Sequence, residues 1–151
     1  MKKKMAACLT GLMMMSGATA LAAVPSSEIA LGGVAPGMDI DEAIAAFGTP
    51  TYRDKGAEAH FSNGVKIDLD EYERATIEEI KLSRKTGVAT PAGITIGSPE
   101  SAIKEAYGEP DKLEYDGGKN KYTYYASDSG MKLKIEAAHG AIIKIKCELD
   151  D

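Results

Sequence analysis

Two stretches of the chain, residues 37–50 and 97–110, look like copies of each other. Each begins with Gly, continues through nine residues, and closes in the order aromatic, Gly, any residue, Pro. Matching positions are offset by 60 residues throughout. A repeated unit sets the architecture before any single element is assigned. The sequence therefore predicts two copies of one small structural unit.

Each copy is expected to open with a short helix. In the first copy, Asp39 is suited to be an N-cap, and Glu42 follows at the spacing of a capping box. Ile40, Ile44 and Phe47 fall on one helical face. The closing Gly and Pro predict the end of each helix, because Gly stops a helix and Pro prevents its resumption.

Strands are expected after each helix, because apolar and polar residues alternate there. Asn63-Gly64 is the strongest two-residue hairpin signal in the chain. Ile77 and Ile80 break the alternation of their segment, which predicts a bulge. In the last segment, residues 141, 143, 145, 147 and 149 are expected to face inward. The expected strands are 58–61, 65–69, 76–82, 121–126, 131–136 and 141–149, and residues 112–115 and the segment at Tyr52 would raise the count to four per copy.

A unit of this size with one short helix buries too little apolar surface to be stable alone. The two copies are therefore expected to share one core. The predicted fold class is α+β: a tandem repeat of a helix followed by an antiparallel β-meander, forming one open sheet of six to eight antiparallel strands with the helices on one face. The predicted organisation is a signal peptide (1–22), a mobile leader (23–30), unit A (31–84), a connector (85–93) and unit B (94–151), with the two units forming one joint domain.

The N-terminus has the pattern of a secretory signal. Three lysines precede an uncharged stretch that ends in the small-x-small sequence Ala20-Leu21-Ala22. Export to the periplasm or the medium is therefore expected, with no stable membrane span after cleavage. Cys147 is then the one remaining cysteine, so no disulfide within the chain is expected, and a buried free thiol is the favoured interpretation over an intermolecular disulfide or a reactive thiol.

Charge limits the classes of partner. Three of the 18 basic residues and none of the 23 acidic ones lie in 1–22, which leaves a net charge of −8. A chain this acidic is a poor candidate for binding nucleic acid or anionic lipid, since both need clustered lysine and arginine. The expected partner is a protein of unknown identity whose surface is basic or of mixed charge.

The order of signals, a Gly-led helix, then aromatic-Gly-x-Pro, then Tyr-x-Tyr and a strand–turn–strand, resembles the beta-lactamase-inhibitor-protein-like fold. That group includes the SmpA/OmlA (BamE-type) envelope lipoproteins, with one such unit, and the tandem beta-lactamase inhibitor proteins, with two. The resemblance covers residues 34–149. It implies a non-enzymatic scaffold that binds proteins, and in the tandem inhibitors the open face of the sheet is the docking surface.

The first interpretation is a non-enzymatic secreted or periplasmic protein-binding module that uses the helix-free face of the sheet. One alternative is an envelope-assembly or cell-wall accessory of the SmpA/OmlA kind. Another is a small extracytoplasmic hydrolase or metal-binding protein. The sequence favours no enzyme, cofactor or metal, because it has two histidines, no Gly-x-Ser-x-Gly, and no histidine or cysteine pair at metal-ligand spacing.

Candidate residues for the partner surface come from the strands. Asp68 and Asp70 alternate with apolar residues in unit A, and Lys132 and Lys134 occupy the matching strand of unit B. The outer face is therefore expected to be acidic on A and basic on B, a polarity that would orient a charged partner. Tyr122 and Tyr124 complete the candidate set. They share one strand face, and tyrosine suits interfaces, but a core position is the open alternative.

Overall fold

The computed structural model describes residues 23–54 and 57–150. A single 3₁₀ turn, η1 (Ser26–Glu28), and two helices, α1 (Ile40–Phe47) and α2 (Ser101–Tyr107), are present in this part of the chain. The strands are β1 (Tyr52–Asp54), β2 (Glu58–His60), β3 (Val65–Leu69), β4 (Ile77–Leu82), β5 (Lys112–Asp116), β6 (Lys119–Tyr125), β7 (Met131–Ala138) and β8 (Ala141–Leu149). The predicted signal peptide, residues 1–22, lies outside the described residues.

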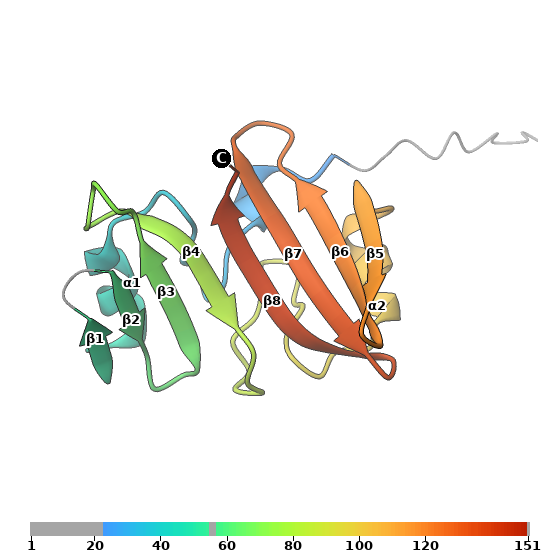
Figure 1. Cartoon of the computed structure of the whole chain (residues 1–151), viewed down its shortest axis with the longest axis horizontal. Coiled ribbons are helices and arrows are strands. Elements are labelled where there is room, and N and C mark those ends of the chain that lie inside the picture. The colour runs from blue at the N-terminus through green and yellow to red at the C-terminus, as the bar shows by residue number, and fades with distance from the viewer. Residues whose placement is uncertain (1–22, 55–56, 151) are drawn as a thin grey trace, which may run out of the picture.

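All eight strands form one antiparallel sheet in the order β1-β2-β3-β4-β8-β7-β6-β5 (Figure 1). Each run of four strands is built from neighbours in sequence. The two runs meet where β4 pairs with β8, and four residue pairs, from Glu79↔Glu148 to Leu82↔Ile145, define that contact. The sheet is open, with β1 at one edge and β5 at the other.

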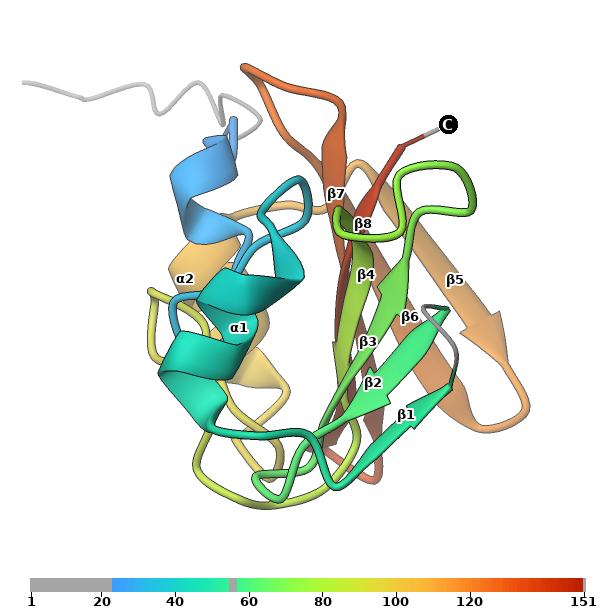
Figure 2. The ribbon, with the colours of Figure 1, turned by 90° about the vertical axis from the view of Figure 1, so that its left-hand side faces the viewer.

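The predicted fold class was wrong. The structure is mostly sheet, with helices of only eight and seven residues, and it is not a tandem repeat of a helix followed by a meander. Two helices this short do not form a layer that matches an eight-stranded sheet. They lie on one side of it, as Figure 2 shows from the edge, and no helix of the described residues covers the other side.

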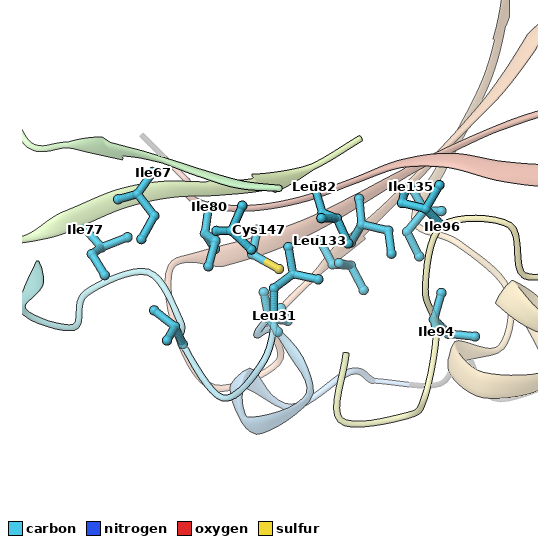
Figure 3. Packing of buried hydrophobic residues seen from close by; sticks show 14 of the residues in the cluster. Leu31, Ile67, Ile77, Ile80, Leu82, Ile94, Ile96, Leu133, Ile135 and Cys147 are labelled. Carbon is cyan, nitrogen blue, oxygen red and sulfur yellow. The ribbon is translucent and has the colours of Figure 1, made fainter. Parts of the chain in front are cut away.

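Non-helical segments supply much of the cover on the helix side. Leu31 and Ile94 come from such segments and lie against the apolar face of the sheet (Figure 3). Across from them, Ile80, Leu133 and Cys147 project from three neighbouring strands and are fully buried. One continuous hydrophobic cluster includes residues from both halves of the sequence.

Residues 23–30, which the sequence predicts to be a mobile leader, contact the rest of the structure. Val24 forms an isolated bridge with Ala126, and the Val24 carbonyl accepts a hydrogen bond from the backbone N–H of Ser127. Ser26 donates from its backbone N–H and from its hydroxyl to Asp128. Ile29 is completely buried. Val24 and Ile29 are therefore part of the shared core, which composition alone did not indicate.

The local signals for the start of α1 and for the end of both helices were confirmed. Asp39 and Glu42 form the capping box at the start of α1. Gly48 and Gly108 end the two helices with φ of 87° and 76°, a left-handed conformation that glycine adopts without a steric penalty.

The predicted bulge in β4 was also confirmed. Leu69 pairs with Ile77 while Asp68 pairs with Glu79, so one residue of β4 is extra. A second bulge was not expected: Ala137 pairs with Ile142, and Glu136 pairs with Lys144. It turns Ile142 inward, so the inward assignment of 141 and 143 was wrong, whereas Ile145 and Cys147 do face the core.

Among residues 23–54 and 57–150, none of the helices has both the length and the apolar composition needed to cross a membrane.

Ile80→Ala in β4 and Leu133→Ala in β7 should each lower the free energy of unfolding by about 2–5 kcal/mol, because each opens a cavity in the same fully buried cluster. Denaturant unfolding followed by circular dichroism should show one transition that both substitutions shift. Glu105→Ala, at an exposed position of α2, is the control, and it should change the free energy of unfolding by no more than about 0.5 kcal/mol. Two transitions, each moved by only one of the variants, would contradict a shared core.

Candidate functional site

The helix-free face of the sheet carries its charges in lines that cross the strands. Lys66, Lys81, Lys146 and Lys134 stand at matching register positions on β3, β4, β8 and β7. We call these four residues the lysine row. Adjacent strands are about 4.8 Å apart, so the row places a cation on each of four successive strands. Through Thr123 on β6, the same line reaches Lys112 on β5.

A second line, the acid row, runs beside the first. It consists of Asp68, Glu79 and Glu148 on β3, β4 and β8. Ion pairs connect the two rows: Lys146 Nζ lies 3.2 Å from Glu79 Oε2 and 2.8 Å from Glu148 Oε2. Lys81 Nζ lies 3.5 Å from Glu79 Oε1. Of these pairs, Lys146–Glu79 crosses between β8 and β4, so it spans the place where the two halves of the sheet meet.

Glu148 is the most enclosed acid of this face, with 9% of its surface exposed. Its carboxylate lies 2.7 Å from Lys134 Nζ, 2.8 Å from Lys146 Nζ and 3.3 Å from Lys132 Nζ. Burial opposes its ionisation, but the hydrogen bonds and charges of Lys134 and Lys146 outweigh burial and lower the pKa of Glu148 to about 2. The side chain is therefore a fixed anion at neutral pH that holds three lysines in place.

Two depressions open on this face. One, of about 240 Å³, adjoins the lysine row, and the other, of about 340 Å³, adjoins the acid row. The first is lined by Lys81, Glu114, Lys121, Thr123, Lys134, Ile135, Glu136, Lys144 and Lys146. The second is lined by Asp68, Glu78, Glu79, Lys132, Glu148 and Leu149. Each is built from strands of both halves, so a group bound in either would contact both.

The structure brings together three of the predicted surface residues and separates a fourth. Asp68 and Lys132 line the second depression, and Lys134 lines the first. Asp70 lies beyond the end of β3, where its Oδ1 accepts hydrogen bonds from the backbone N–H groups of Tyr72 and Glu73 at 2.8 and 2.6 Å. Those two bonds lower the pKa of Asp70. Its main contacts are thus with its own turn.

Tyr122 and Tyr124, the other two candidate residues, do not lie on the helix-free face and take the core position that was the open alternative. They face the helix side and are 7% and 0% exposed. The Tyr122 hydroxyl donates to Glu100 Oε1 at 2.7 Å, and the Tyr124 hydroxyl donates to the Gly108 carbonyl at 2.8 Å. Both bonds tie β6 to the ends of α2. Burial is the largest cause of the raised pKa of both tyrosines, which is about 12 for Tyr122.

The expected polarity, acidic on one half and basic on the other, is also corrected. Each half contributes to both rows: Lys66 and Lys81 come from the first half, and Glu148 comes from the second. The row residues that sequence reasoning missed are Lys66, Glu79, Lys81, Lys146 and Glu148. All of them except Glu79, which follows Glu78, alternate with apolar neighbours, which indicated an outward position, but the alignment of the five depends on the β4–β8 register.

The described residues contain no group of three or more histidine, cysteine, aspartate or glutamate side chains arranged to hold a metal ion. Cys147 is a free, fully buried thiol in the core. Burial raises its pKa far above the usual value for cysteine.

Comparisons with known proteins assign no family. No protein-family model matches the chain, and no curated protein matches it. Two solved structures are similar in shape. One is a DUF4309 family protein (YjgB) from Bacillus subtilis, with 16% identity, a TM-score of 0.49, and coverage of 74% of this chain and 78% of that one. The other is an extracellular protein containing a SCP domain from Bacillus anthracis, with 12% identity, a TM-score of 0.46, and coverage of 77% of this chain and 44% of that one.

Glu148→Gln should lower the free energy of unfolding at pH 7 by about 1–3 kcal/mol, because three lysines lose their shared anion. The difference from the wild type should be constant above the ordinary glutamate pKa of 4.5 and shrink as pH falls toward 2. The sign follows from a pKa that is lower in the folded state: the unfolded chain takes up the proton first, so acid removes the stabilisation.

Urea unfolding across this pH range measures the effect. Glu114→Gln is the matched control, since Glu114 pairs with Lys112 at an exposed position and should change stability by less than about 0.5 kcal/mol. A Glu148→Gln deficit that stays constant down to pH 2 would show that the carboxylate is not held ionised by the lysines.

Proposed function

We propose that this protein is a non-enzymatic, exported protein-binding module that contacts its partner through the helix-free face of the sheet. The two depressions on that face, built jointly by strands from both halves, carry the proposal. The outer face of an antiparallel sheet, with charges of both signs, often contacts only solvent. Here, however, the ion pairs hold lysine and glutamate side chains in fixed positions beside concave surface, which favours recognition.

The charges of the face define the kind of partner. Because the lysine row and the acid row lie side by side, a complementary surface presents both signs in adjacent lines. Such an arrangement gives orientation and selectivity more than affinity, since like charges meet if the partner is displaced by one row. A partner protein of mixed charge fits this pattern.

Two predictions from the sequence support this proposal: export from the cytoplasm and the resemblance to a known fold group. The secretory pattern of residues 1–22 supports a periplasmic or extracellular location. The likeness of residues 34–149 to the beta-lactamase-inhibitor-protein-like group stays a prediction from sequence, and it supports a scaffold that binds proteins.

Affinity capture from envelope and culture medium, followed by binding measurements on the captured protein, tests the proposal. The variant Lys121→Glu/Lys144→Glu reverses two charges in the first depression, and Asp68→Lys reverses one in the second. Each should weaken binding by about tenfold or more and change its salt dependence. The matched control is Lys104→Glu/Glu105→Lys on α2, which should bind as the wild type does.

Wild-type affinity and salt dependence in the face variants, together with a loss of binding in the α2 variant, would move the interface to the helix side and contradict the proposal. Circular dichroism of each variant checks that the fold is retained.

A further inference from the structure

Strand β5 forms one edge of the sheet, and its side chains are all exposed. No described segment pairs with its outer side. The opposite edge, β1, has three residues, whereas β5 has five. Natural proteins usually protect such an edge, because its free N–H and C=O groups are a template for another strand.

The turn that follows β5 determines which backbone groups are free. Asp116 pairs with Lys119 across a two-residue turn in which Gly117 and Gly118 have φ of 58° and 82°. In such a hairpin the residues that flank the turn exchange hydrogen bonds, and bonded positions then alternate along the strand. Leu113 and Tyr115 therefore direct their N–H and C=O groups away from β6, toward the open edge.

The side chains of β5 separate into two sets. Leu113 and Tyr115 stand on the helix side of the sheet, opposite Tyr122 and Asn120 in register, and are 51% and 76% exposed. The other three residues, Lys112, Glu114 and Asp116, lie on the helix-free face. The edge thus presents two exposed apolar side chains on one face and three charged ones on the other.

This pattern is complementary to itself when it is read in the reverse direction. If two β5 strands run antiparallel about a two-fold axis at Glu114, Leu113 of each copy is opposite Tyr115 of the other. Leu113 and Tyr115 are the two residues whose backbone N–H and C=O groups point toward the open edge. In the same register, Lys112 is opposite Asp116 at both ends. Cross-strand pairs of opposite charge and of apolar with aromatic side chains stabilise a sheet.

We propose that a second copy of this chain pairs with β5 along this edge, so that two eight-stranded sheets join into one through Leu113–Tyr115 and Lys112–Asp116 contacts. A two-fold axis makes every contact occur twice. Glu114 meets its own copy at the centre, where each keeps its partner Lys112 at 3.2 Å within the chain. The inference goes beyond the proposed function and does not depend on it, because it rests on the pairing of the β5 edge; Glu114 is shared with the lining of the first depression.

The second copy is favoured over an unrelated strand by the order of charges. Any extended segment could satisfy the free backbone groups, but only a segment with acid and base in the reverse order also satisfies Lys112 and Asp116, and β5 itself has that order. Their exposed fractions, 57% and 73% for the two side chains, leave both available. Their present partners, Glu114 and Lys121, are also exposed, so these ion pairs are weak and leave Lys112 and Asp116 able to contact a further charge without losing them.

Analytical ultracentrifugation of the purified exported protein, up to about 1 mM to include weak complexes, tests the proposal. The wild type should show a monomer–dimer equilibrium. Lys112→Asp and Asp116→Lys should each weaken dimerisation by about tenfold, because each places like charges opposite one another at both ends. The double variant Lys112→Asp/Asp116→Lys should restore the dimer, since it exchanges the two charges of each pair.

Two further variants separate the edge from general surface effects. Tyr115→Pro removes an outward N–H, which the fold tolerates at an edge position, and should abolish the dimer while circular dichroism stays unchanged. Asp54→Lys, on the edge strand β1, should leave the dimer unaffected. A wild type that is monomeric at every concentration overturns the proposal, as does a dimer that the single reversals leave intact or that the double exchange fails to restore.

Discussion

The backbone pairing of β4 with β8 is the constraint on which the rest of the structure depends. Among the strands that the structure describes, those of the first half hydrogen-bond to those of the second only at this contact. On the apolar face it sets Ile80 opposite Cys147, both fully buried, and so continues one core through the middle of the sheet. Each half alone would expose the side chains that meet there, and a domain of that size has little stability in reserve.

The same contact decides what the other face presents. A slip of one residue between β4 and β8 would bring charged side chains into the core and apolar ones to the surface. A slip of two residues would keep the faces but misalign the rows, since Lys81 and Lys146 would no longer be level. Glu79 and Lys146, 3.2 Å apart across the contact, favour the observed register. Core packing and surface charge pattern thus have one common determinant.

Features set by near neighbours in sequence could be predicted, and features set by distant ones could not. The capping box of α1, the glycine helix ends and the bulge of β4 follow from a few adjacent residues. The open antiparallel sheet followed from the alternation of its strands. The balance of helix and sheet was misjudged, because local helix signals do not reveal that segments without regular structure complete the cover of the sheet.

The candidate site was predictable only in part for the same reason. Alternation placed Lys132 and Lys134 outward, but it could not choose a face for Tyr122 and Tyr124, since either set of β6 residues could meet α2. The alignment of the lysine row depends on the order and register of four strands, two from each half of the chain. No local pattern contains that information.

Cys147 gives the central contact a chemical property of its own. It is the one cysteine outside residues 1–22, and it lies in the β4–β8 pairing with its sulfur in the core. In an oxidising compartment an accessible thiol would be captured in mixed disulfides, whereas this one is shielded as long as the two strands remain together. Its reaction with an alkylating reagent is therefore a measure of how often the middle of the sheet opens, obtained without any introduced label.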